Sequence, residues 1–523
     1  MILKSFKNII SRWLTPKAPT IHKRMYAAVK NLRATSWGQS NTSADSELNT
    51  SLRPLRTKSR ALVRDSSYAK RAKVIIVNNV VGMGIGVQAQ VKTSRDVLNK
   101  RINDSIEDAW KEWSKAKNCH TGGTLHFNDL EKMVMGQVFE AGEVFVRKHY
   151  RRFDGSAKVP FTLEVIEAER ICDEYQPGPV SPGNVVKMGV ESDTYGKPIA
   201  YWIRELHPGE IRQAYLATDR VERVPAEQII HLRIIDRWPQ TRGEPWLHTA
   251  AAKLGDMDGY SEAEIVAARG AACYMGIIES PDIDSFGETQ ADGSQVIDRE
   301  PGLTQKLLPG EKYTDVSPNR PNPNMDPFMR LMLREVAAGI GVSYESLSRD
   351  YSQSNYSSSR LALIDDRDLW RTLQKWFIRN FREEIHNEWL QQAVLSRAVS
   401  AIGIDEYASA PEKFQAVRFK PRGWSWVDPT KEVEAYKEAI RAGFMTVGEV
   451  IALTGGGRDL EDVLQERKQE LELMEEAGLK FDTEYKEDKV TPKVTEPDDD
   501  DMQDNKSKIK NKLSIVKEGG RYA

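Results

Sequence analysis

The sequence predicts an α+β fold, in which strands and helices concentrate in different stretches of the chain. Alternating apolar and polar residues, the pattern of half-buried strands, recur between residues 144 and 233. Apolar residues at helical spacing dominate residues 326–395 and return in residues 428–478. The length of 523 residues allows roughly three domains.

The two ends of the chain have opposite charge and little core-forming pattern. Residues 1–55 are predicted to be a flexible basic arm, rich in Lys and Arg, in which Thr, Ser, Asn and Asp dominate from residue 35 to residue 51. Its first 14 residues are typical of a short amphipathic helix and not of a signal peptide, because charges interrupt the apolar residues. The tail, residues 481–523, is predicted to be disordered and contains Asp498–Asp501. A basic arm indicates an anionic partner, and an acidic tail indicates solubility or a basic partner. The alternative is that both ends are merely solvated and disordered.

Between the arm and the strand region, the apolar spacing predicts helices joined by a turn and a short strand. Asn128 is of a residue type that caps helices, so we expect it to cap the last of these helices. The predicted elements are helices over 60–81, 97–113 and 128–140, a glycine-rich turn over 82–86 and a strand over 87–91.

The strand region is predicted to be antiparallel, because a turn sequence, Asp193-Thr194-Tyr195-Gly196, links two of its strands as a hairpin. Strands are expected over 144–150, 161–166, 185–190 and 199–204, with one or two more over 221–233. The rest is predicted as an Ala-rich helical stretch over 246–278, loops and strands over 280–325, and helices over 326–395 and 428–478.

The composition is that of a soluble globular protein, with 40% hydrophobic and 29% charged residues and a net charge of -2. Cys119, Cys172 and Cys273 form no C-x-x-C pair, which predicts a reducing compartment and no disulfide framework. No apolar run approaches the roughly 20 residues of a membrane span, so we expect no membrane partner.

The sequence contains no recognisable catalytic, cofactor or metal motif. Gly82-x-Gly84-x-Gly86 has the wrong spacing and setting for a dinucleotide fingerprint, and no G-x-x-x-x-G-K-[ST] or G-x-S-x-G occurs. The cluster of Cys119, His120 and His126 fits no standard zinc spacing. His207 and His231 have no partner visible in sequence. These absences predict a protein that is not an enzyme and holds no cofactor.

A polar stretch, residues 349–360, is the strongest candidate for contact with another molecule. It contains no aliphatic residue, although helical patterns flank it on both sides. A loop of this kind touches a ligand or is merely solvated, and its composition fits both. The candidate contact residues are Arg349, Tyr351, Ser352, Gln353, Asn355, Tyr356 and Arg360.

Several segments, in order, resemble the lambda-type family of phage portal proteins from about residue 60 to residue 395. Their order and spacing make chance agreement improbable. The segments are residues 64–84, Trp110-Lys111-Glu112-Trp113 with Cys119, residues 189–202, residues 223–231 (RVPAEQIIH), residues 242–247 (RGEPWL), and residues 337–345 (AAGIGVSYE) leading into the polar stretch.

The resemblance implies a portal-type subunit with a mixed α/β wing, a helical stem, a small β-containing clip and an α-helical crown. Residues 346–359 would then be a tunnel loop that faces DNA. The implied boundaries are wing 56–258, stem helices 259–278 and 326–345, clip 279–325, long helix and wing 360–429, and crown 430–480.

The same resemblance implies a ring, usually a dodecamer, at a phage capsid vertex, with double-stranded DNA passing through its channel. The implied partners are the terminase large subunit, neck or head-completion proteins, and the major capsid and scaffold proteins. The location would be the virion, and the host cytoplasm during assembly. A nucleic-acid-processing enzyme such as a nuclease, and a head-completion or scaffold protein without a channel, remain the alternatives.

The composition of the polar stretch suits a channel in which DNA slides. Every phosphate that a protein neutralises adds salt-dependent affinity, so a conduit should hold few cationic contacts. Arg349 and Arg360 are the cationic residues of the stretch, and we expect Asp350 to offset part of the charge of Arg349.

Overall fold

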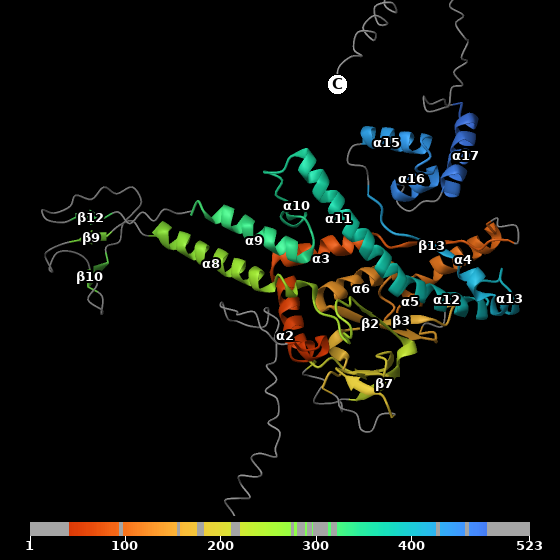
Figure 1. Cartoon of the computed structure of the whole chain (residues 1–523), viewed down its shortest axis with the longest axis horizontal. Coiled ribbons are helices and arrows are strands. Elements are labelled where there is room, and N and C mark those ends of the chain that lie inside the picture. The colour runs from red at the N-terminus through yellow and green to blue at the C-terminus, as the bar shows by residue number, and fades with distance from the viewer. Residues whose placement is uncertain are drawn as a thin grey trace, which may run out of the picture. The chain divides into compact units, whose positions relative to one another are not determined.

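The chain divides into two units, Met1–Leu460 and Glu461–Ala523. The computed structural model describes residues 41–93, 98–153, 157–174, 182–210, 220–273, 277–279, 288–289, 295–296, 312–314, 322–424, 429–454 and 460–478. The expected arm up to residue 40, the tail and most of the expected clip lie outside these residues. The predicted α+β class is confirmed by long helices and antiparallel sheets (Figure 1).

The main helices and strands follow the predicted order, whereas α5, α13, α14 and β13 were not predicted. The helices are α2 (Ala44–Asp65), α3 (Ser67–Val80), α4 (Lys100–Trp113), α5 (Ala116–Cys119), α6 (Phe127–Ala141), α8 (Ala251–Cys273), α9 (Met325–Ile340), α10 (Tyr344–Ser348), α11 (Tyr356–Phe377), α12 (Glu383–Leu395), α13 (Ile404–Ser409), α14 (Pro411–Gln415), α15 (Pro429–Arg441), α16 (Val447–Thr454) and α17 (Leu460–Glu476). The strands are β1 (Gly86–Ala89), β2 (Glu143–His149), β3 (Thr162–Ile166), β4 (Val185–Lys187), β5 (Val190–Ser192), β6 (Pro198–Arg204), β7 (Val221–Pro225), β8 (Ile229–Arg233), β9 (Ile277–Glu279), β10 (Glu288–Thr289), β11 (Gln295–Val296), β12 (Lys312–Thr314) and β13 (Val417–Lys420).

The ordered chain begins earlier than predicted. We expected order from about residue 55, but α2 begins at Ala44, where the side chain of Ser43 accepts a hydrogen bond from the Ser46 amide at 3.2 Å. Leu48 and Leu52, one helical turn apart, are buried. The single helix expected over residues 60–81 is also wrong, because the chain breaks at residue 66 between α2 and α3.

Two antiparallel sheets form the strand region. The three-stranded sheet has the order β3-β2-β8 and the four-stranded sheet the order β4-β5-β6-β7. Successive residues of β2 point to opposite faces, so Val144 and Val146 join the main core, while Phe145 packs with Tyr201 in a second core between the two sheets. The central strand β2 is therefore buried on both faces.

The predicted hairpin is confirmed as β5 and β6. The carboxylate of Asp193 accepts hydrogen bonds from the amides of Tyr195 and Lys197 at 2.9 and 2.8 Å, which closes the turn. The strand expected over 185–190 is two strands, β4 and β5. They are separated by Met188 and Gly189, which have φ angles of 45° and 78°.

The main core joins α3, α4, α6, α11 and α12 to one face of the three-stranded sheet. The predicted long helix is confirmed, and it runs through α11, a π-helical turn η5 (Ile378–Arg382) and α12. Trp110 packs edge-on against Trp389, with ring centroids 4.8 Å apart. The expected cap of α6 is wrong: the side chain of His126, and not that of Asn128, accepts the capping hydrogen bond.

The helices α8 and α9 lie side by side and run antiparallel (Figure 1). Thr249, near the start of α8, donates a hydrogen bond at 3.0 Å to the carbonyl of Gly339, near the end of α9. Further along the pair, Tyr260 of α8 packs edge-on against Phe328 of α9. No described helix is both long and apolar enough to cross a membrane.

Candidate functional site

The polar stretch lies between α10 and α11, and its non-helical part is residues 349–355, which we call the contact loop. Arg349 ends α10 in the left-handed conformation, with a φ of 59°. Asn355 caps α11, and its side chain and that of Ser358 exchange hydrogen bonds with each other's backbone amides. Both ends of the contact loop are thus fixed by helix termini.

A buried carboxylate, Asp366 on α11, holds α10 in place. It accepts hydrogen bonds from the amide and hydroxyl of Ser343 at 2.8 and 2.7 Å and from the hydroxyl of Ser346 at 2.7 Å. Its residue is only 4% exposed, so these bonds compensate for the loss of water around the carboxylate. The start of the contact loop is therefore tied to the long helix that follows it.

The structure brings most of the predicted contact residues together in the contact loop but separates two of them. Tyr351 is 60% exposed, while Gln353 accepts a hydrogen bond from Arg334 of α9 at 3.3 Å. Tyr356 is the first residue of α11. Arg360 lies further along α11 and its guanidinium is 3.9 Å from the carboxylate of Glu432. Arg349, Tyr351, Ser352, Gln353 and Asn355 are the predicted residues that lie in the contact loop.

Asp350, which was expected to offset part of the charge of Arg349, forms no salt bridge with Arg349 among the described residues and has other contacts. The carboxylate of Asp350 accepts hydrogen bonds from the Ser352 amide at 3.0 Å and from the Tyr344 hydroxyl at 2.8 Å. It also lies 3.6 Å from Arg330 of α9. The hydrogen bonds from Ser352 and Tyr344 lower the pKa of Asp350 to about 2, so this carboxyl is ionised at neutral pH.

Arg349 consequently keeps a positive charge that no described carboxylate neutralises through a salt bridge. A second arginine, Arg71 of α3, adds to this charge and was not among the predicted residues. Its Nε donates to the carbonyl of Ser346 at 3.3 Å, just before the contact loop. Sequence reasoning missed Arg71 because it lies 275 residues away from that contact.

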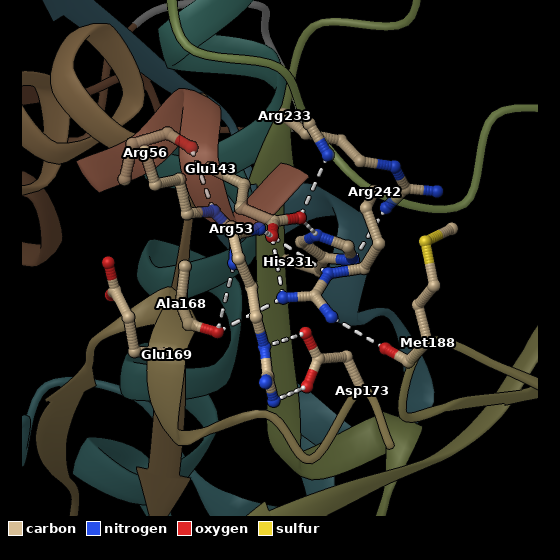
Figure 2. A network of polar contacts seen from close by, with 12 residues as sticks. Arg53, Arg56, Glu143, Ala168, Glu169, Asp173, Met188, His231, Arg233 and Arg242 are labelled. Carbon is tan, nitrogen blue, oxygen red and sulfur yellow. Dashed lines mark hydrogen bonds and ion pairs between the residues drawn. The ribbon is translucent and has the colours of Figure 1, made fainter. Parts of the chain in front are cut away.

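A second polar cluster, around Glu143 of β2, has residue types found in catalytic sites (Figure 2). Its carboxylate is fully buried and lies 2.8 Å from Nε2 of His231. It also accepts hydrogen bonds from Arg242 at 2.7 Å and from the Gly243 amide at 2.9 Å, and it pairs with Arg56 of α2. These four donors occupy the acceptor positions that two carboxylate oxygens offer.

The charges of this cluster are arranged for structure rather than for chemistry. Burial alone would raise the pKa of Glu143, but Arg242, Arg56 and the hydrogen bond from His231 lower it well below its ordinary value. Burial and the charge of Arg233 lower the pKa of His231 to about 3. The neutral imidazole is then fixed between Arg233 and Glu143 and has no free nitrogen for a substrate.

Among the described residues, those that could bind a metal ion have other partners. Glu167, Glu169 and His207 have ligand atoms within 4.8 Å of one another, but Arg60 lies 3.6 Å from Glu167 and 2.8 Å from Glu169. Cys119, which the sequence placed near His120 and His126, is buried and its thiol lies 3.4 Å from the carbonyl of Ser114. Burial raises the pKa of the Cys119 thiol to about 12, which disfavours the thiolate that metals bind.

Comparison with solved structures gives likenesses at low sequence identity. The chain is similar to a chain in the neck of a native gene transfer agent particle computed with C12 symmetry, with 15% identity and a TM-score of 0.41. This match covers 76% of the present chain and 92% of the other. A chain in the neck of the empty particle, computed with C6 symmetry, matches with 16% identity and a TM-score of 0.42, over 76% of the present chain and 93% of the other.

Comparison of sequences identifies the family. The model of the lambda family of phage portal proteins matches residues 30–374. The probable portal protein of Halomonas phage phiHAP-1 is 29% identical over 477 residues, covering 88% of this chain and 89% of that protein. Portal protein B of Escherichia phage lambda is 23% identical over 493 residues, covering 85% and 88%. The chain therefore belongs to the lambda family of phage portal proteins.

Proposed function

We propose that this portal protein assembles into a closed ring at the capsid vertex and that double-stranded DNA enters and leaves through the ring. The observation that carries the proposal is the contact loop. It is polar and fixed at both ends by helices, and it includes Arg349, whose charge no described carboxylate neutralises through a salt bridge. A loop that faces passing DNA needs such adaptable polar groups and few strong phosphate contacts.

The proposed arrangement follows from the order of the elements. The antiparallel pair of α8 and α9 serves as the stem, and the contact loop is the tunnel loop that projects into the channel. The sheets and the helices packed on them form the wing, and α15, α16 and α17 contribute to the crown. The segment between α8 and α9 is the clip, which docks the terminase large subunit and later the neck proteins. Capsid and scaffold proteins contact the ring from outside, in the virion and during assembly in the host cytoplasm.

The ring itself is tested by electron microscopy of the purified full-length protein under assembling conditions. We expect closed rings, dodecamers by analogy with the family, with a central opening of about 20 Å or more, the width of B-DNA. Monomers and dimers alone would contradict the proposal. Rings without such an opening would favour a head-completion or scaffold protein, and metal-dependent cleavage of DNA would favour a nuclease.

Replacing Arg349 and Tyr351 by Ala should leave ring assembly intact but impair DNA packaging or retention. Tyr351 is exposed and Arg349 makes no described salt bridge, so truncating them should cost little stability. Packaged DNA is measured as nuclease-protected DNA in complementation or packaging assays. If rings fail to assemble, while the rings that do form package normally, the contact loop has a structural role instead.

A further inference from the structure

We propose that Arg71 of α3 and Arg349 of the contact loop together form a binding site for the phosphodiester backbone of DNA. This inference rests on the proposed function, and it adds Arg71, a residue of α3 that lies outside the contact loop. The site would consist of two guanidinium groups and the exposed phenol of Tyr351. Its expected ligand is a phosphate oxygen pair, with no preference for base sequence.

The backbone geometry brings the two arginines to the same end of α10. Arg71 Nε donates at 3.3 Å to the carbonyl of Ser346, in the last turn of that helix. Arg349 is the residue that ends the helix, and its amide donates at 2.9 Å to the carbonyl of Glu345. The left-handed conformation of Arg349, with a φ of 59°, is uncommon for a residue with a side chain.

The pKa of Arg71 is consistent with a position of its side chain near Arg349. Its pKa is lowered, first by partial burial and then by the positive charge of Arg349, while Tyr351 acts in the opposite direction. The two positive charges repel each other, and neither arginine has a salt bridge to a carboxylate among the described residues. An anion between them would remove the repulsion, which makes the pair favourable for a ligand and unfavourable as an empty structural contact.

The neighbouring arginines differ in this respect. Arg330 lies 3.0 Å from Asp326 and 3.6 Å from Asp350, and Arg334 packs over the ring of Tyr344. Arg360 pairs with Glu432. Carboxylates therefore pair with Arg330 and Arg360, while Arg334 is held by the ring of Tyr344 and by its hydrogen bond to Gln353. Arg71 and Arg349 are the better-suited phosphate ligands of this region, because neither is engaged in these ways. Guanidinium groups suit that task because their planar N–H donors match two phosphate oxygens.

A purely structural role for Arg71 is the competing explanation, since its hydrogen bond satisfies a carbonyl at the end of α10. Two substitutions separate the roles. Arg71→Gln keeps a side-chain donor for the carbonyl of Ser346 and removes the charge, whereas Arg71→Lys keeps the charge. Arg64→Ala serves as the control, because Arg64 is an exposed arginine on α2 that already pairs with Asp65 at 2.8 Å.

The experiment measures binding of a short fluorescein-labelled DNA duplex to the assembled full-length protein by anisotropy, over a series of salt concentrations. Arg71→Gln and Arg349→Gln should each weaken binding roughly fivefold and lower the slope of log affinity against log salt by about 1 for each phosphate that is no longer neutralised. Arg71→Lys should retain most of the affinity, and Arg64→Ala should match the wild type. Inorganic phosphate, added at constant ionic strength, should compete only weakly.

The outcomes separate this inference from the proposed function. Wild-type affinity and salt slope in Arg71→Gln, with Arg349→Gln impaired, would overturn the role of Arg71 and leave the contact loop as the DNA-facing element. Equal loss of affinity in Arg71→Gln and Arg71→Lys, with an unchanged salt slope, would assign Arg71 a structural role and also overturn the inference. Complete displacement of DNA by phosphate would indicate a site for the free anion and would overturn it too. Rings of wild-type protein that bind no DNA would contradict the proposed function itself.

Discussion

Glu143→Gln is expected to destabilise the first unit by about 3–5 kcal/mol, the usual cost of removing one partner from a buried ion pair. The carboxylate lies between the guanidinium groups of Arg56 and Arg242, and the side chains of Glu143 and Arg242 are 0% exposed. Gln would keep the volume but deprive the buried guanidinium groups of Arg56 and Arg242 of the carboxylate that they share. The same change would weaken the attachment of α2, because Arg56 connects that helix to β2.

The expected measurement is urea unfolding at pH 7, followed by tryptophan fluorescence, together with hydrogen exchange of α2. Exchange in α2 should accelerate more than exchange in α12, since α2 loses its buried anchor. Glu112→Gln is the matched control: Glu112 is half exposed and pairs with Lys115, so its loss should change stability by less than about 1 kcal/mol. A similarly small change for Glu143→Gln would show that the buried charges are not balanced by this carboxylate.

The sequence predicted those parts of the fold that depend on local pattern. The hairpin of β5 and β6 was predictable because Asp193 and Gly196 are turn residues between alternating strands. The start of α2 was missed, although Leu48, Leu52 and Leu55 recur at helical spacing within a polar segment and could have revealed it. In that segment the polar composition was given more weight than the helical spacing of the leucines.

The interactions that depend on distant residues could not be read from the sequence. Glu143 is 87 residues from Arg56 and 99 from Arg242, so no spacing rule could pair them. The polar character of the contact loop was visible, but the partner of Asp350 was predicted from its neighbour in the chain. In the structure the carboxylate of Asp350 instead accepts a hydrogen bond from Tyr344 of α10 and lies near Arg330 of α9. These partners are available because α9 and α10 pack against each other. With Asp350 engaged in this way, no described salt bridge pairs Arg349 with a carboxylate.

His386→Phe is expected to make the protein less sensitive to acid. The imidazole of His386 is fully buried on α12, with ring centroids 5.6 Å from Trp110 and 5.8 Å from Trp389. Burial, and next the charge of Arg382, lower its pKa from 6.5 to about 3. In the unfolded chain the imidazole regains its ordinary pKa, so between pH 6.5 and about 3 the unfolded state binds more protons than the folded state.

The sign of the effect follows from that difference in bound protons. The contribution of the neutral His386 to the free energy of unfolding is fully present above pH 6.5. It decreases as the pH falls, by about 1.4 kcal/mol per pH unit, which amounts to about 3 kcal/mol at pH 4.5. Phe cannot titrate, so the free energy of unfolding of His386→Phe should gain about this amount relative to wild type between pH 8 and pH 4.5. Glu131, whose pKa burial raises to about 7, and His231 are present in both proteins, and their contributions largely cancel in the comparison. Urea unfolding of both proteins across this pH range measures the difference. If it is constant from pH 8 to pH 4.5, His386 takes up its proton as readily in the folded core as in the unfolded chain.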